Sequence, residues 1–176
     1  RDLIVTGVQT CALPIYQRNP AVQEGLIMKI AIGSDHGGYA LKQALIPFLQ
    51  GRDIEVADAG THSEDSVDYP SFGEAVALLV AHGEVDAGIV ICGTGIGISI
   101  AANKVPGIRA ALVTTPQMAE LAKQHNNANI LALGGRILSQ EAAEACIAAW
   151  LDASYEGGRH QRRLDLITDL EHKYDR

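Results

Sequence analysis

The stretch that decides the fold is Ala87-Gly88-Ile89-Val90-Ile91, followed by Cys92-Gly93-Thr94-Gly95-Ile96-Gly97-Ile98-Ser99. Its first five residues form an uninterrupted apolar run, which is typical of a strand that is covered on both faces. The glycines at alternate positions allow the backbone to turn tightly, and a helix is expected to start there. Strands covered on both faces belong mostly to parallel sheets that lie between layers of helices.

The same alternation continues on both sides of this stretch. Four further strands are predicted, over Lys29–Gly33, Ile54–Ala57, Ile108–Val113 and Ile130–Leu133. Helical patterns separate and follow them, at Leu41–Leu49, Phe72–Val80, Pro116–Gln124, Gln140–Leu151 and Arg162–Tyr174. Because strand and helix alternate five times, the sequence predicts a Rossmann-like, three-layer α/β/α fold with a five-stranded parallel sheet. Pro47 lies inside the first of these helices and predicts a kink or a local break.

Composition limits the class of protein and its partners. The chain has 176 residues, of which 47% are hydrophobic and 20% charged, as in ordinary globular domains. The formal net charge of −7 argues against nucleic acid or an anionic membrane as the main partner. The three cysteines are too few for a disulfide framework, so a reducing, cytoplasmic location is expected. The longest uncharged run, residues 87–103, is divided by glycines and makes a poor transmembrane helix.

The first 27 residues differ from the rest because they carry no sustained helix or strand period. Residues 5–15 look like the in-frame translation of a common sequencing-library adapter. We interpret residues 1–27 as an extraneous leader outside the fold, and residues 28–176 as a single domain that starts at Met28. A targeting segment is the alternative, but polar residues interrupt the apolar run that a signal peptide requires.

Candidate site residues follow from a rule of sheet geometry. In folds of this class, ligands bind at the carboxyl ends of the parallel strands. Asp35 and His36 come after the first strand, and the glycine-rich turn from Cys92 to Gly97 comes after the third. The segments after the fourth and fifth strands belong to the same edge.

The turn after Cys92 has the pattern of an anion site. Its N–H groups and the start of a helix would favour negative charge, including that of a thiolate. The alternative is that Cys92 is a small buried hydrophobic residue, and spacing alone does not decide. A dinucleotide site is disfavoured because Gly97 comes one position early and no acidic residue lies about twenty positions on. A cysteine phosphatase is disfavoured because Ile98 stands where its arginine is needed.

The other candidates also have two interpretations. Asp35 could bond its own turn, with His36 exposed to solvent. His125 and Asn126 are placed in a loop before the fifth strand, where turn chemistry alone would explain them. Arg159 and Arg163 are four residues apart and could converge on one phosphate, or could be an exposed helix start. We find no histidine spacing typical of a metal centre and predict no metal site.

Five motifs in order resemble one family. They are Gly33-x-Asp35-His36-Gly37-Gly38, Asp68-Tyr69-Pro70, Cys92 to Lys104, His125-Asn126 and Tyr155-Glu156-Gly157-Gly158-Arg159-His160. Together they closely resemble the ribose-5-phosphate isomerase B family, whose wider group includes allose-6-phosphate and galactose-6-phosphate isomerases. The resemblance runs from Met28 to about Lys173.

The resemblance implies a role for each matching residue. It makes Cys92 the base that moves a proton between C2 and C1 of the sugar and His125 the acid that opens the furanose ring, and Thr94 is catalytic with them. It assigns substrate binding to Asp35, His36, Gly93, Gly95, Ile96, Gly97, Asn126, Arg136, Arg159 and Arg163. Within this set the glycine turn holds the enediolate, and the arginines bind the phosphate and the sugar. Family members with serine as residue 92 use a glutamate as residue 96, so this chain resembles the cysteine type.

The resemblance therefore implies an aldose–ketose isomerase for ribose 5-phosphate and ribulose 5-phosphate that uses no metal or cofactor. It also implies a homodimer or dimer of dimers with shared active sites, in which Arg159 and Arg163 reach the partner's site. A six-carbon sugar phosphate, such as allose or galactose 6-phosphate, is an alternative substrate. A non-catalytic sugar-phosphate binder is disfavoured because Cys92, Thr94 and His125 are all present. A nicotinamide-dependent oxidoreductase is disfavoured by the glycine spacing.

Overall fold

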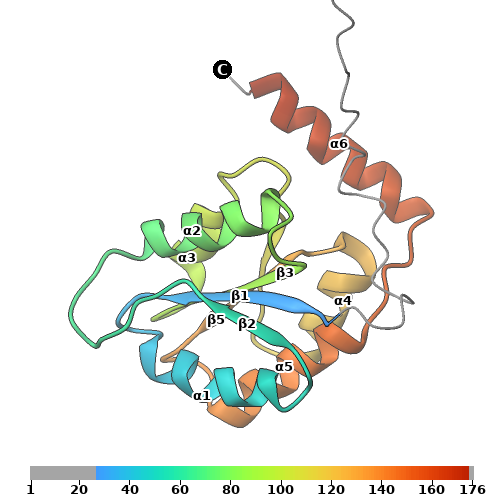
Figure 1. Ribbon diagram of the computed structural model, residues 1–176. Coiled ribbons are helices and arrows are strands. Elements are labelled where there is room, and N and C mark those ends of the chain that lie inside the picture. Colours follow the sequence, from blue (N-terminus) through green and yellow to red (C-terminus); the bar gives the residue numbers. More distant parts are fainter. Residues whose placement is uncertain (1–26, 175–176) are drawn as a thin grey trace, which may run out of the picture.

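The computed structural model describes residues 27–174, which form a parallel sheet between helices (Figure 1). The strands are β1 (Lys29–Ser34), β2 (Glu55–Asp58), β3 (Ala87–Cys92), β4 (Ala110–Leu112) and β5 (Ile130–Gly134). Their order is β2-β1-β3-β5-β4, and every neighbouring pair is parallel. This confirms the predicted fold class. The interpretation of residues 1–27 as a leader lies outside the described residues, apart from Ile27.

Six helices accompany the strands in the described part of the chain. They are α1 (Tyr39–Gln50), α2 (Tyr69–Ala81), α3 (Ile96–Ala102), α4 (Pro116–Asn126), α5 (Gln140–Asp152) and α6 (Arg159–Tyr174). The hydrophobic core beneath α1, α4 and α5 is separate from the one beneath α2 and α3. Because successive residues of a strand point to opposite faces, each strand contributes to both cores, which explains its continuous apolar sequence.

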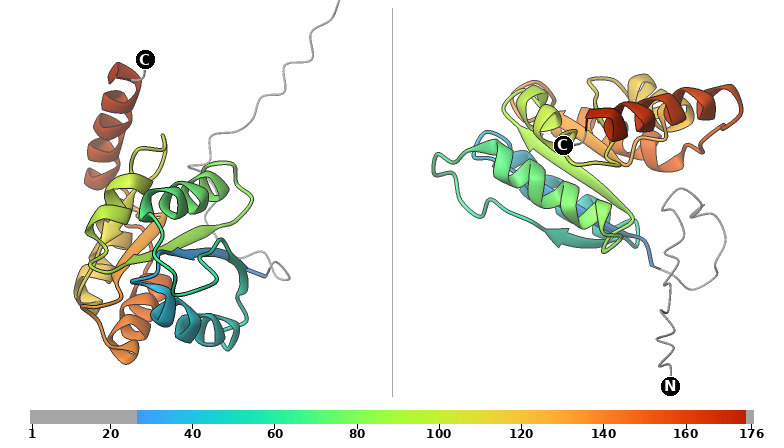
Figure 2. Two further views of the ribbon diagram at one scale, coloured as in Figure 1. Left: turned by 90° about the vertical axis from the view of Figure 1, so that its left-hand side faces the viewer. Right: turned by 90° about the horizontal axis from the view of Figure 1, so that it is seen from above.

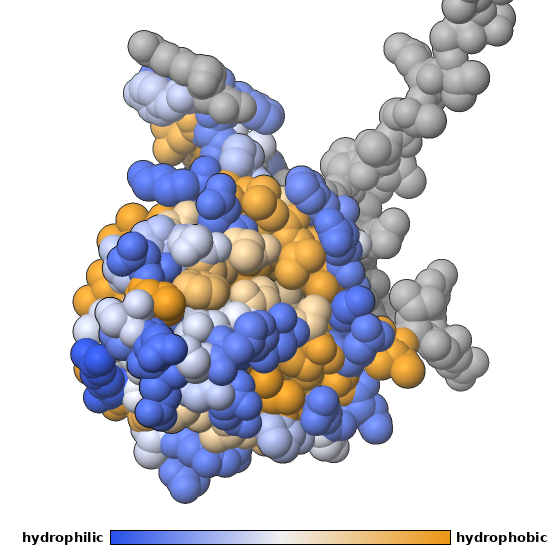
Figure 3. Space-filling view, turned by 60° about the vertical axis from the view of Figure 1, so that its left-hand side comes forward, coloured by the Kyte–Doolittle hydropathy of each residue, from blue (hydrophilic) through white to orange (hydrophobic). Residues whose placement is uncertain are grey.

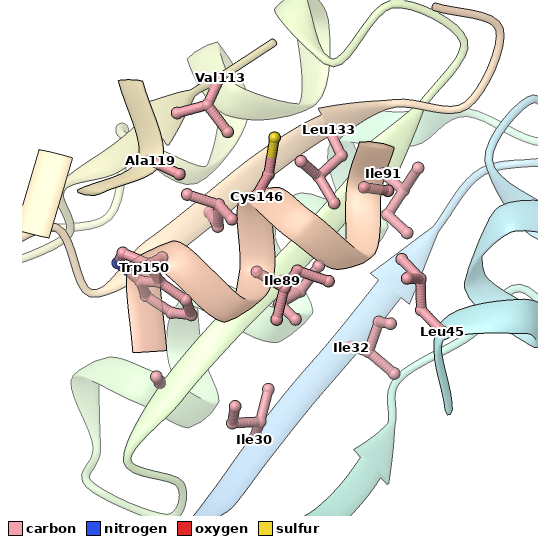
Figure 4. Packing of buried hydrophobic residues seen from close by; sticks show 14 of the residues in the cluster. Ile30, Ile32, Leu45, Ile89, Ile91, Val113, Ala119, Leu133, Cys146 and Trp150 are labelled. Carbon is pink, nitrogen blue, oxygen red and sulfur yellow. The ribbon is translucent and has the colours of Figure 1, made fainter. Parts of the chain in front are cut away.

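The core on the side of α1 and α5 holds the larger side chains (Figure 4). Ile32 of β1 and Ile89 of β3 are fully buried there, as is Cys146 of α5. Trp150 of α5 is 1% exposed, and its indole Nε1 donates a hydrogen bond to the Ala128 carbonyl at 3.1 Å. Burial raises the pKa of the Cys146 thiol, so this cysteine is a packing residue without a reactive thiolate.

Two local predictions need correction. Of the two outcomes predicted at Pro47, the break does not occur: helix α1 runs on to Gln50, and the Gly51 N–H donates to the Pro47 carbonyl. Helix α4 ends at Asn126, two residues later than predicted, so His125 and Asn126 lie in its last turn and not in a loop. Asn127 then ends the helix in the left-handed conformation, which asparagine tolerates.

Helix α6 extends away from the body of the domain (Figures 1 and 2). Only His160 and Leu164 of this helix are buried. Leu166, Leu170 and Tyr174 are 57%, 53% and 66% exposed, so most of its apolar surface is uncovered within the chain. Within residues 27–174, no helix is long and apolar enough to cross a membrane.

Candidate active site

The loops after β1, β3 and β5 meet at the carboxyl edge of the sheet. The Gly135 N–H donates to the Cys92 carbonyl at 2.8 Å, and the Arg136 N–H donates to the Gly93 carbonyl at 3.0 Å. Gly37, in the loop after β1, lies so close that an added Cβ would stand 3.1 Å from Gly93 Cα. The structure thus brings together the candidates that the sheet rule placed after these strands.

Cys92 is the last residue of β3 and lies at the mouth of the glycine turn. It is 4% exposed, and its Sγ accepts a hydrogen bond from the Gly95 N–H at 3.1 Å. A backbone donor on the sulfur stabilises negative charge there. Gly95 has a φ of 79°, and a Cβ on it would lie 2.8 Å from the backbone carbonyl carbon of Leu133. Only glycine fits this position, and its conformation aims the N–H at the sulfur.

The start of α3 completes the turn. The Thr94 hydroxyl oxygen accepts a hydrogen bond from the Ile96 N–H at 3.3 Å, while the Ile96 side chain is 53% exposed. Gly97 lies against the ring of Tyr69, since a Cβ there would be 2.5 Å from Tyr69 Cζ. The sequence motif at residues 68–70 includes Tyr69 but gives it no role. In the structure this tyrosine covers one side of the turn.

Asp35 and His36 lie beside this turn. Asp35 is 6% exposed, and its Oδ1 accepts a hydrogen bond from the Gly38 N–H at 3.0 Å, as the turn interpretation predicts. The Asp35 backbone N–H donates to the Ile91 carbonyl of β3. His36 is half-buried, with its Nδ1 3.2 Å from both the backbone N and O of Val67. The Asp35 carboxylate therefore has a structural role in the turn after β1.

Arg136 provides positive charge at the same edge. A Cβ on Gly93 would lie 3.5 Å from Arg136 Nη1, so the guanidinium borders the Cys92 turn. The face around this edge also carries exposed apolar residues between hydrophilic ones (Figure 3). Ile96 and Ile100 of α3, and Ile137 after β5, are more than half exposed.

His125 and Asn126 do not join Cys92 within one chain. They end α4 at the amino end of β5, whereas Cys92 lies at the carboxyl end of β3. Strands β3 and β5 pair with Gly88 opposite Ile130 and Cys92 opposite Gly134. The Gly88–Ile130 pair and the Cys92–Gly134 pair are four residues apart along the strands, which is about 13 Å at roughly 3.3 Å per residue. Within one chain, Cys92 and His125 therefore lie at opposite edges of the sheet.

A second polar group forms at this amino edge, which we call the amino-edge cluster: His125, Glu156, Arg159 and His160. The rings of His125 and His160 stack with centroids 4.2 Å apart and planes 7° from parallel. Glu156 Oε2 lies 3.8 Å from His125 Nε2 and 3.4 Å from His160 Nε2. The Arg159 Nε–H points to His160 Nε2 at 3.4 Å.

Electrostatics disfavour the charged form of His160 in the amino-edge cluster. Burial lowers the pKa of His160, and the positive charges of His125, Arg159 and Arg163 lower it further, against the opposing effect of Glu156. Sequence reasoning missed the link between His125, Glu156 and His160, because His125 is far from the other two along the chain. A hydrogen bond from the Glu156 N–H to the Gln124 carbonyl joins the two segments.

The fold and the carboxyl edge define an α/β protein with a thiol and an N–H turn suited to bind an anion. The family model described as Ribose/Galactose Isomerase matches residues 30–167. The chain belongs to this family, which confirms the resemblance seen in the motifs.

Relatives and solved structures agree with this family. Ribose-5-phosphate isomerase B of Escherichia coli (strain K12) is 52% identical over 145 residues, covering 82% of this chain and 97% of that protein. The Clostridium thermocellum ribose-5-phosphate isomerase B structure is 57% identical and has a TM-score of 0.83, covering 84% of this chain and 99% of that one. The Mycoplasma genitalium enzyme with bound ribulose 5-phosphate is 42% identical, with a TM-score of 0.79 and coverage of 83% and 97%.

Proposed function

We propose that this protein interconverts ribose 5-phosphate and ribulose 5-phosphate through an enediolate. The observation that carries this proposal is the hydrogen bond from the Gly95 N–H to Cys92 Sγ, in a turn bordered by Asp35 and Arg136. Relatives named ribose-5-phosphate isomerase B match nearly their whole length, which supports the five-carbon substrate over allose or galactose 6-phosphate.

The carboxyl edge supplies the groups that this reaction needs. The Cys92 thiolate takes the proton from C2 of the open-chain aldose, and the C2–H electrons form the enediolate double bond. The thiol then returns a proton to C1 while the proton on O2 moves to O1, so that the C2–O2 bond becomes the carbonyl of the ketose. Negative charge develops on the sugar oxygens, and the N–H groups of residues 93–97 stabilise it. Asp35 and His36 bind sugar hydroxyls. This scheme uses no metal or cofactor.

The remaining groups come from a second copy of the chain. His125 opens the furanose ring, Asn126 contacts the sugar, and Arg159 and Arg163 bind the phosphate. All four belong to α4 and α6 at the amino edge, about a strand length from Cys92 of the same chain, so a partner must supply them. Arg136 borders the Cys92 turn and serves its own chain.

The exposed apolar surface supports such an assembly. Leu166, Leu170 and Tyr174 lie uncovered on α6, and Ile96 and Ile100 on α3 next to the Cys92 turn. Exposed apolar patches of this kind mark protein interfaces. We propose a homodimer or a dimer of dimers formed by residues 28–176. A reduced Cys92 is required, which fits the cytoplasmic location expected from the cysteine content.

A single assay tests the activity. Purified protein is incubated with ribose 5-phosphate and a chelator, without nucleotide, and ketose formation is followed. Allose 6-phosphate and galactose 6-phosphate are measured in parallel. We expect turnover of the five-carbon substrate with the highest kcat/KM. Higher kcat/KM for a six-carbon substrate, or no turnover of any of them, would contradict the proposal.

A further inference from the structure

The amino-edge cluster contains an acidic residue to which neither the motifs nor the proposed mechanism gives a role. Glu156 is half exposed, yet one of its carboxylate oxygens lies within 3.8 Å of His125 Nε2 and 3.4 Å of His160 Nε2. His160 is 4% exposed, so its ring is part of the packed structure. His125 is more accessible, with 35% of its side chain exposed.

We propose that Glu156 is a positioning residue that holds the His125 imidazole for ring opening, with the buried His160 ring as the surface against which it stacks. This proposal rests on the proposed function, in which His125 is the ring-opening acid. The stacking at 7° fixes the plane of the His125 ring. The carboxylate on one edge of the ring then fixes its rotation within that plane. A general acid must present its proton in one direction, so both constraints serve the step.

The surroundings of His160 also disfavour a charged ring at that position. Protonating both imidazoles at a centroid distance of 4.2 Å is unfavourable, because their positive charges repel. His160 is buried and faces Arg159 and Arg163, which disfavours its charged form. The Glu156 carboxylate therefore lies between a buried histidine whose charged form is disfavoured and His125, the ring that the proposed mechanism uses.

A metal site is the competing interpretation of the same residues. The ligand atoms of His125, Glu156 and His160 all lie within 4.8 Å of one another. An imidazole binds zinc in its ring plane at about 2.0–2.1 Å. Because the two rings are stacked and nearly parallel, no point at that distance lies in both ring planes. One ion therefore cannot bind a nitrogen of each ring unless the stack is broken. The observed geometry favours stacking over metal binding.

Two assays separate ring opening from proton transfer. Ribose 5-phosphate is a closed furanose, so its conversion requires ring opening. Ribulose 5-phosphate cannot close such a ring, because its O5 carries the phosphate. Uptake of deuterium at C1 of ribulose 5-phosphate in deuterium oxide therefore requires the base but not the ring-opening acid.

The test variant is Glu156→Gln, which keeps the shape and removes the charge. The matched control is Glu84→Gln, since Glu84 also lies beside a histidine, 3.6 Å from His82, but is exposed in the turn after α2. We expect Glu156→Gln to lower kcat with ribose 5-phosphate about tenfold or more relative to the control, within the roughly 10²–10⁴-fold contribution of a general acid. Deuterium uptake from ribulose 5-phosphate should change by less than about twofold.

A second variant tests the stacking surface. His160→Phe keeps a flat ring but removes both nitrogens, and we expect ring opening to stay within about threefold of wild type. Equal losses in both assays for Glu156→Gln, or no loss in either, would overturn the positioning role. A metal-binding role would also overturn it. In that case added Zn²⁺ would inhibit the wild type but not Glu156→Gln, and the kcat of Glu156→Gln without Zn²⁺ would be normal. Wild type that is inactive in both assays would instead refute the proposed function.

Discussion

Mixing two inactive variants, Cys92→Ala and His125→Ala, tests the division of the active site between two chains. Cys92 lies at the carboxyl end of β3 and His125 at the amino end of β5, which the strand register separates by about 13 Å along the strands. Proton transfer requires contact at about 3 Å, so one chain cannot bring both groups to one sugar. In a mixed dimer, one site would carry both substitutions and the other neither.

The expected recovery follows from this symmetry. Random exchange of equal amounts makes half of the dimers mixed, and each has one intact site of two. Activity should therefore rise from the background of the parents to about a quarter of wild type. The assay is ribulose 5-phosphate formation from ribose 5-phosphate after subunit exchange, with exchange measured independently by mass spectrometry of differently tagged chains. Proven exchange without recovered activity would refute the reasoning.

Three further substitutions test single features. Cys92→Ser should lower kcat by about 10²–10⁴-fold with KM nearly unchanged, because a hydroxyl is a far weaker base; near-normal kcat would remove Cys92 from its role. Gly95→Ala should lower the free energy of unfolding by about 2 kcal/mol or more and abolish turnover, because φ is 79° and the Leu133 backbone is in the way. Unchanged thermal stability would contradict the strain argument. Cys146→Ala should cost about 1 kcal/mol of stability in denaturant titrations and leave kcat intact; a loss of kcat would show that its burial in the core is not its only function.

The fold was predictable because its strands are buried on both faces. The continuous apolar run before Cys92 predicts such a strand, and the structure confirms β3 over Ala87–Cys92. The rule that ligands bind at carboxyl ends likewise predicts that Asp35, Cys92 and the segment after the fifth strand are near one another, and their loops are joined by backbone hydrogen bonds. These inferences need only local patterns and the order of the strands.

The position of His125 was harder to predict, because it depends on where a helix ends. Helix α4 is two residues longer than predicted, so it includes His125. The helix leads into the start of β5, and His125 therefore lies at the amino edge of the parallel sheet. The contact of His125 with Glu156 and His160 is harder still to predict, since no short spacing connects α4 with the start of α6. Side-chain stacking across distant segments leaves no periodic signal in one sequence.

The distance between Cys92 and His125 also has a thermodynamic consequence for assembly. A sugar phosphate that bridges two chains binds the dimer and not the separated monomers, so the ligand and the association of the chains are linked. At a ligand concentration 100 times its dissociation constant, each site would contribute about 2.7 kcal/mol to the dimer, or about 5 kcal/mol for two. Substrate would then hold together chains that separate on dilution, and specific activity would depend on protein concentration when substrate is scarce.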